Sequence, residues 1–189
     1  MNRFKAVALM AALTALPSTV AGQVHDHEVF AGFARLSIES DEGLESQATG
    51  GLHLAWYRRL VGRWGTVLDV SVNHGTIELP TATYGTAEVE RSNVLLLAGV
   101  RRNGFRGRRL RLAFRAQAGV SIGSIEESTA TPLDVEGTAF AGAIGGAVMV
   151  DLNDRLTLRL IQPTFMLTTH GGGVQFTRRL SVGLAWKSR

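Results

Sequence analysis

Apolar and polar residues alternate with a period of two over residues 174–187, near the end of the chain. A period of two places the two sets on opposite faces of a β-strand. One face carries Val174, Phe176, Arg178, Leu180, Val182, Leu184 and Trp186. The segment therefore predicts a strand with an apolar face, although Arg178 interrupts that face. If this face meets lipid, Arg178 must lie near the outer headgroups, or the phase slips there, because a lipid-facing arginine is costly at mid-membrane.

The same alternation predicts further strands upstream. Residues 52–57, 64–73, 110–122 and 140–150 alternate cleanly, whereas 28–38, 88–102 and 156–169 are β-like with a less clear phase. Pro163 predicts an irregular hydrogen-bond ladder in its strand. The eight predicted strands are 28–38, 49–60, 63–74, 88–102, 108–123, 138–151, 156–169 and 174–187.

Short and long connections alternate strictly between these strands. The short ones contain "LVGRWG", "RNGFRG" and "DLNDR"; the long ones are "ESDEGLESQAT", "GTIELPTATYGTAEVE" and "SIEESTATPLDVEGT", with "HGGGVQ" a shorter fourth. Outer-membrane barrels have short periplasmic turns, long extracellular loops and tilted strands of at least ~9–11 residues. The pattern predicts an all-β fold: an eight-stranded antiparallel up-and-down transmembrane β-barrel.

A soluble up-and-down barrel, such as a lipocalin, is the alternative with the same alternation. Its large apolar residues would line an internal cavity. Here the polar set is rich in Gly, Ala and Ser, which favours a narrow packed lumen. Aromatic residues also lie near predicted strand ends, where membrane interfaces place them; these are Trp56, Tyr57, Trp64, Phe176 and Trp186.

Residues 1–22 have the features of a cleavable signal peptide. Arg3 and Lys5 precede an apolar stretch, 6–16, and Pro17 ends it. Cleavage after Ala21 or Gly22 fits the small residues that follow. We therefore expect a signal peptide over 1–22, a barrel domain over 23–189, export by the Sec pathway and residence in the cell outer membrane.

Composition and charge exclude several function classes. The chain has no Cys, which removes disulfides and thiolate metal sites. Loss of Arg3 and Lys5 lowers the basic residues from 20 to 18, against 16 acidic, for a net charge of +2. So small a net charge gives no reason to expect nucleic-acid binding.

The charges are divided between the two predicted ends of the barrel. Segments 38–49, 74–92 and 124–138 hold four, three and four acidic residues, 11 of the 16, and one basic residue, Arg91. Segments 58–64, 101–109 and 151–155 hold three, five and one arginines. An acidic outer rim could bind divalent cations that bridge lipopolysaccharide; the alternative is that these are simply solvated loops.

An eight-stranded barrel has an interior just wide enough for side chains. The odd face of 108–123 would place Arg109, Arg111, Arg115 and Gln117 in the lumen, together with Asp69, Ser71, Asn73, His53 and Arg179 from other strands. Buried arginines require paired carboxylates. Asp69 is the one acid in the clean strands, so we predict an Asp69–Arg115 or Asp69–Arg111 pair. We expect this polar lumen network of Asp69, Arg111, Arg115, Gln117 and Arg179 to hold the fold; ion conduction is the alternative.

Catalytic and metal motifs are weak in this sequence. His74 and His170 are predicted at the extracellular rim without a recognisable serine partner or an orienting acid, as acyl-transfer chemistry would need. Segment 25–28, "HDHE", could bind a metal, but a polar tail explains it equally well. "HGGGV" lacks the lysine and the helix of a phosphate-binding loop. We expect no enzymatic activity, no cofactor and no metal.

The closing residues resemble the last hairpin of small outer-membrane β-barrel proteins of the OmpA-type or porin family. The matching positions are Arg159, Gln162, Phe165, Arg179, Ser181, Gly183 and Trp186; the preceding strand and turn match at Gly145, Gly146, Asp151 and Arg155. The resemblance implies an eight-stranded barrel inserted by the barrel-assembly machinery. That machinery would read the final strand through Leu180, Val182, Leu184 and Trp186, although "KSR" follows the aromatic here.

These observations predict an integral outer-membrane barrel with a structural or surface-exposed role. The expected partners are outer-membrane lipid and lipopolysaccharide, and we expect a monomer. A narrow pore or carrier for small solutes is the first alternative, and a lipid A-modifying barrel enzyme is the second.

Overall fold

The computed structural model describes residues 27–38, 47–81, 85–127, 135–170 and 173–188. The predicted signal peptide and residues 25–26 of "HDHE" lie outside these ranges. The described chain forms eight strands: β1 (His27–Ile38), β2 (Gln47–Val61), β3 (Trp64–Thr81), β4 (Gly85–Arg106), β5 (Leu110–Glu127), β6 (Val135–Asp151), β7 (Leu156–His170) and β8 (Gly173–Ser188). No helix among these residues is long and apolar enough to cross a membrane.

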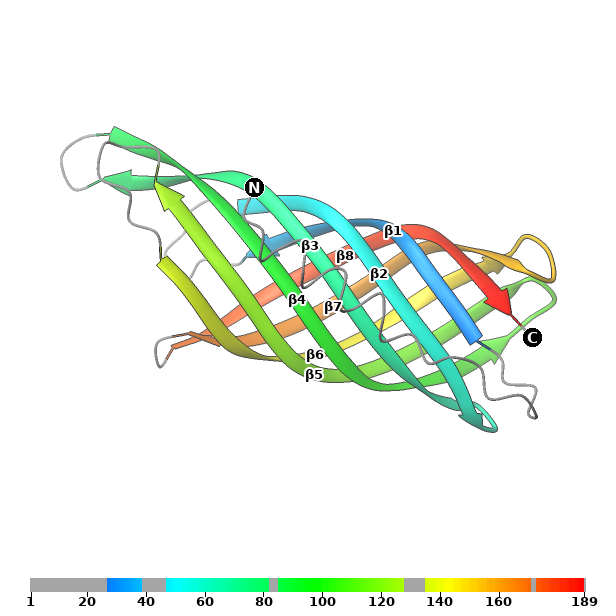
Figure 1. Ribbon diagram of the computed structural model, residues 1–189. Helices are drawn as coiled ribbons and strands as arrows, with labels where there is room; N and C mark the ends of the chain where they lie inside the picture. The colour runs from blue at the N-terminus through cyan, green and yellow to red at the C-terminus, as the bar shows by residue number, and fades with distance from the viewer. Residues whose placement is uncertain (1–26, 39–46, 82–84, 128–134, 171–172, 189) are drawn as a thin grey trace.

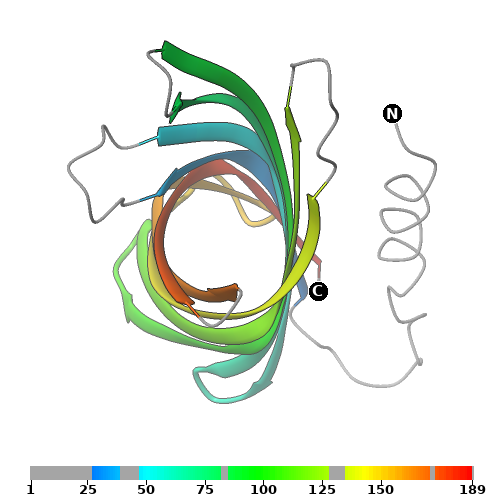
Figure 2. The same cartoon turned by 90° about the vertical axis from the view of Figure 1, so that its left-hand side faces the viewer.

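Every strand pairs antiparallel with its neighbours in sequence, and β8 pairs with β1 to close the barrel. The closing seam runs from His27, opposite Ser188, to Ile38, opposite Thr177. Figure 1 shows the strands steeply inclined to the barrel axis, and Figure 2 shows the closed ring along that axis. The predicted all-β antiparallel barrel is confirmed.

The clean alternations give the predicted faces. Leu52, Leu68 and Phe114 are exposed on the outside, whereas their neighbours His53, Asp69 and Arg115 are buried inside. A soluble barrel would have the opposite arrangement, with its polar set facing outward. The exposed apolar surface therefore favours the membrane barrel over the lipocalin-like alternative.

The closing strand keeps its predicted phase through Arg178. Thr177 and Arg179 are buried in the lumen, and Arg178 between them is exposed on the outer face, opposite Ser37 of β1 and Phe165 of β7. Arg178 lies in the half of β8 that follows the β7–β8 connection, on the predicted extracellular side. The arginine therefore interrupts the apolar face without a slip in register.

Several strand bounds differ from the sequence prediction, and the largest difference is at the second predicted long loop. β3 continues to Thr81 and β4 begins at Gly85, so most of the second predicted long loop is a β-hairpin. Its pairs include Ile77 with Val89 and Thr76 with Glu90. β-Branched residues favour extended backbone, and this propensity outweighs the polar composition that suggested a loop.

β7 is irregular, as Pro163 predicted. Its register against β8 shifts between Arg159 and Gln162, and β6 shifts between Val148 and Met149 at the same place. Arg159 and Gln162 have opposite parity, yet both are buried in the lumen. The bulge therefore brings onto one face two side chains that a regular strand would separate.

Candidate functional site in the barrel lumen

The lumen holds a group of charged residues centred on Asp69, here called the Asp69 cluster. The carboxylate of Asp69 lies 2.6 Å from Arg115 Nη1 and 3.0 Å from Arg179 Nη1. His53 Nε2 lies 2.9 Å from the same carboxylate. Arg115 also donates a hydrogen bond to Thr164 of β7. One carboxylate thereby connects β2, β3, β5 and β8, and Arg115 adds β7.

A second cluster surrounds Glu28 and is here called the Glu28 cluster. Glu28 lies 2.8 Å from Arg101 Nη1 and 2.6 Å from Arg159 Nη2, and Arg111 Nη2 lies 3.6 Å away. Arg159 also donates a hydrogen bond of 2.6 Å to Gln162. This carboxylate connects β1 with β4, β5 and β7 across the lumen.

Aromatic rings pack on the guanidinium groups of the Glu28 cluster. Arg159 lies 4.1 Å from the centre of the Phe30 ring, and Arg101 lies 4.3 Å from that of Tyr57. Tyr57 is buried and accepts a hydrogen bond from Asn103, so its predicted place in the membrane-interface girdle is wrong. Cation–π contacts of this kind are strengthened where water is excluded.

A third group, the rim cluster, lies at the end of the barrel formed by the short turns. Asp151 lies 2.9 Å from Arg111 and 3.0 Å from Lys187. Thr157 donates a hydrogen bond to the same carboxylate. A basic vestibule of about 590 Å³ opens beside it, and Glu28 and Arg111 contribute to its wall.

Apolar side chains fill the part of the lumen toward the other end of the barrel. Leu36, Leu95, Leu97 and Met166 form a buried cluster with Ala141 and Ala143. The sequence analysis placed small and polar side chains in the lumen and did not predict this apolar cluster. The omission has a physical cause: strands β1, β4 and β7 carry apolar residues on both faces, so their inward set could not be separated from their outward set by composition.

The structure brings some of the predicted lumen residues together and separates others. Asp69 pairs with Arg115, the first of the two predicted alternatives, and Arg179 joins them. Arg111 instead contacts Asp151 and Glu28. Gln117 is buried without a hydrogen-bond partner among the described residues. Arg109, expected in the lumen, is exposed before β5 begins.

Sequence reasoning missed the Glu28 cluster. Glu28 was grouped with a polar N-terminal tail that could bind metal, but it lies within β1 and is 3 % exposed. Its two arginine partners occupy strands of unclear phase. No group of three or more possible metal ligands occurs in the part of the chain that the structure describes.

The histidine at position 74 has a serine neighbour that the sequence analysis did not identify. His74 Nδ1 lies 3.0 Å from Ser92 Oγ, because β3 and β4 pair these two residues. Within the described ranges, no carboxylate lies at ion-pair distance from His74. Among the side chains that the structure describes, the contact has no third, orienting group of the kind that an acyl-transfer triad uses.

The comparisons with known proteins match at the level of fold. Neisserial surface protein A (NspA) aligns with a TM-score of 0.64 and 12% identity over 86% of this chain and 97% of its own. Ail, the attachment invasion locus protein of Yersinia pestis, was solved in complex with the heparin analogue sucrose octasulfate. It aligns with a TM-score of 0.62 and 10% identity over 88% of this chain and 100% of its own. The outer membrane protein OprG from Pseudomonas aeruginosa aligns with a TM-score of 0.54 and 12% identity over 89% of this chain and 98% of its own.

No protein-family model and no curated protein sequence matches the chain. The solved structures cover almost the whole barrel at low identity, so what they share with this chain is the arrangement of strands. The chain has the fold of the small eight-stranded outer-membrane β-barrels.

Proposed function

We propose that this protein is an integral outer-membrane barrel that does not conduct solutes and that displays acidic loops at the cell surface. One observation carries the proposal: the lumen is filled across its width. Glu28 and Asp69 each bind arginines from other walls of the barrel, and the cluster around Leu95 fills the adjacent space. A pore would need a continuous water-filled path in place of these contacts.

The low-dielectric surroundings of the clusters favour a structural role. A buried charge separated from its partner is strongly destabilising, so each ion pair resists the opening that conduction would require. Glu28, which binds two buried arginines, lines the vestibule at the rim cluster, and this supports a closed recess rather than the entrance of a channel. A narrow pore stays the alternative and predicts conductance.

The acidic segments suggest which surface partners fit. Segments 38–49, 74–92 and 124–138 carry 11 acidic residues (four, three and four) and one basic residue. Such loops repel polyanions, so a sulfated ligand like that in the Ail complex does not suit them. Divalent cations bridging the loops to lipopolysaccharide phosphates suit them better. Export through Sec and insertion by the barrel-assembly machinery, reading Leu180, Val182, Leu184 and Trp186, complete the proposal.

The distribution of glutamate allows a sharp test of surface display. The chain has ten glutamates, and all but Glu28 lie in the three acidic segments. A glutamate-specific protease added to intact cells should cut these segments while the barrel stays in the outer-membrane fraction. Cells with a permeabilised outer membrane should give the same fragments, because the short turns carry aspartate and no glutamate.

Two results would contradict the proposal. Protein found in the soluble periplasmic fraction would exclude an integral barrel. Cleavage that requires permeabilisation would place the acidic segments on the periplasmic side. Migration on a gel that changes on heating, as closed barrels show when they unfold, checks in the same sample that the protein is folded.

A further inference from the structure

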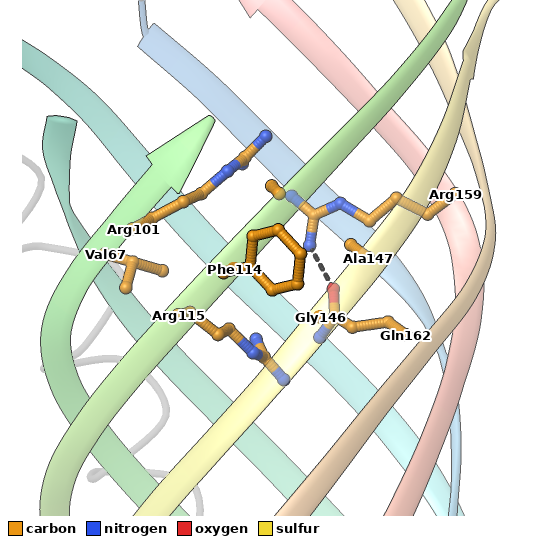
Figure 3. Close-up of a pocket in the computed structure, with 9 residues that line it drawn as sticks. Val67, Arg101, Phe114, Arg115, Gly146, Ala147, Arg159 and Gln162 are labelled. Atoms are coloured by element: carbon orange, nitrogen blue, oxygen red, sulfur yellow. Dashed lines mark hydrogen bonds between the residues drawn. The ribbon is translucent and has the colours of Figure 1, made fainter. Parts of the chain in front are cut away.

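A small cavity lies in the lumen between the Glu28 and Asp69 clusters. It offers about 10 Å³ to the centre of a water-sized sphere, which is room for one small particle. Its polar lining consists of Arg101, Arg115, Arg159 and Gln162. Figure 3 shows Arg101 and Arg115 on one side of this pocket and Arg159 with Gln162 on the other.

The lining residues carry nitrogen donors that the protein does not use. The Nε atoms of Arg101, Arg115 and Arg159 and the Nε2 atom of Gln162 are buried and have no hydrogen-bond partner among the described residues. All four side chains are more than nine-tenths buried; Gln162 is 1% exposed and Arg159 3%. Buried donors without acceptors are unfavourable, so these N–H groups favour an acceptor in the space they surround.

The charge balance also favours a negative acceptor. Within the described residues, the buried charged groups of the lumen comprise two carboxylates and four arginines; they are Glu28, Asp69, Arg101, Arg115, Arg159 and Arg179. Each carboxylate is shared by two of these arginines. A buried excess of two positive charges is strongly disfavoured at low dielectric unless an anion accompanies it.

The bulge in β7 builds this arrangement. It turns Gln162 to the same face as Arg159, where the Gln162 side-chain oxygen accepts a hydrogen bond from Arg159 Nη1 at 2.6 Å. This bond fixes the orientation of the amide, so its NH₂ group remains available. A water molecule could accept from these donors, but it would leave the charge excess unchanged.

We propose that this cavity binds one small monovalent inorganic anion of the chloride class. The arginines supply charge and Gln162 supplies a neutral donor. The small size of the cavity favours such an ion over tetrahedral oxyanions such as sulfate and phosphate. The anion would lie between the two clusters and connect them electrostatically. Its binding therefore stabilises the folded barrel, and this role does not require that the barrel transport solutes.

Unfolding of the refolded protein in detergent tests this proposal. Urea midpoints are measured in sodium chloride and in sodium gluconate at equal ionic strength, because gluconate is too large for the cavity. We expect a higher midpoint in chloride that saturates with concentration. The unfolding equilibrium constant should fall about elevenfold at a chloride concentration ten times its Kd. Equal midpoints in the two salts would overturn the proposal.

Two glutamine variants locate the site. Gln162→Glu supplies a built-in negative charge at the cavity, so the chloride response should disappear. Gln117→Glu adds the same charge at a buried glutamine that does not line the cavity, and it should keep the response. A chloride response that survives Gln162→Glu and disappears in Gln117→Glu would refute this location.

Crystals of the unmutated protein grown in sodium bromide give an answer that needs no variant. Bromide scatters anomalously and replaces chloride. A peak within hydrogen-bond distance of Arg101, Arg159 or Gln162 is expected. A map without a peak between the two clusters would exclude the site even if chloride raises the midpoint.

Discussion

The carboxylate of Asp69 lies 2.6 Å from the guanidinium of Arg115, across the lumen from β3 to β5. Neither strand is hydrogen-bonded to the other, since β4 lies between them. The ion pair therefore adds a connection that the backbone ladder does not provide. Glu28 does the same for β1 and β4 through Arg101, which makes the two carboxylates internal cross-links of the barrel.

Asp69→Asn should lower the free energy of unfolding by about 3–5 kcal/mol, because it leaves Arg115 and Arg179 buried without a full counter-charge. Asparagine has nearly the same size as aspartate, so the change in the free energy of unfolding measures the loss of charge and not a change in packing. Urea unfolding in detergent micelles measures it. Asp154→Asn, at an exposed aspartate in the β6–β7 turn, is the matched control and should change little. Equal effects of the two variants would mean that the buried pair does not hold the barrel.

Glu28→Gln and Asp151→Asn should lower the free energy of unfolding by different amounts in the same urea assay. Glu28 is 4% exposed at its side chain and holds two buried arginines, so its loss should also cost about 3–5 kcal/mol. The side chain of Asp151 is 18% exposed and that of Lys187 is 23% exposed. Water screens this rim pair, so Asp151→Asn should cost about 1 kcal/mol or less. A larger loss of unfolding free energy for Asp151→Asn than for Glu28→Gln would contradict the assignment of Asp151 to a solvent-screened rim pair.

Gly32→Ala should destabilise the closing seam by about 1–3 kcal/mol through overpacking. A Cβ atom at Gly32 would lie 2.2 Å from the carbonyl oxygen of Val182 and 2.7 Å from the Phe30 ring. The ring, on which Arg159 packs, would have to shift. Gly50→Ala is the control, because a Cβ there meets nothing within 4 Å. Thermal unfolding in detergent compares the two, and an equal shift of Tm would contradict the close approach at the seam.

The sequence was sufficient to predict the fold because several signals agree. Alternation with period two, strand lengths and the order of short and long connections all point to one closed antiparallel barrel. The ends of the strands were harder to predict: residues 75–81, with Ile77 and Leu79, were assigned to a loop because Glu78 and Pro80 stand among them. Pairing with β4 supplies the hydrogen bonds that make them strand, and that pairing is a tertiary property.

The lumen was predictable only where the phase of a strand was clear. Asp69 and Arg115 lie in cleanly alternating strands, and the structure brings them together. Glu28 lies in β1, where Val29 and Phe30 are both apolar and composition does not decide which faces inward. The pairing of β1 with β8 decides which residues of β1 face inward. Leu36 pairs with inward-facing Arg179, so the even residues of β1 lie inside the barrel. The bulge that turns Gln162 inward has only Pro163 as its sequence signal.

Single-channel recording across a planar lipid bilayer tests most directly the claim that the Glu28 and Asp69 clusters close the lumen. The refolded protein should show no steady conductance, and the double variant Glu28→Ala/Asp69→Ala, which removes both carboxylates, should open more often if it inserts. A steady, reproducible conductance from the unmutated protein would contradict the account and establish a pore.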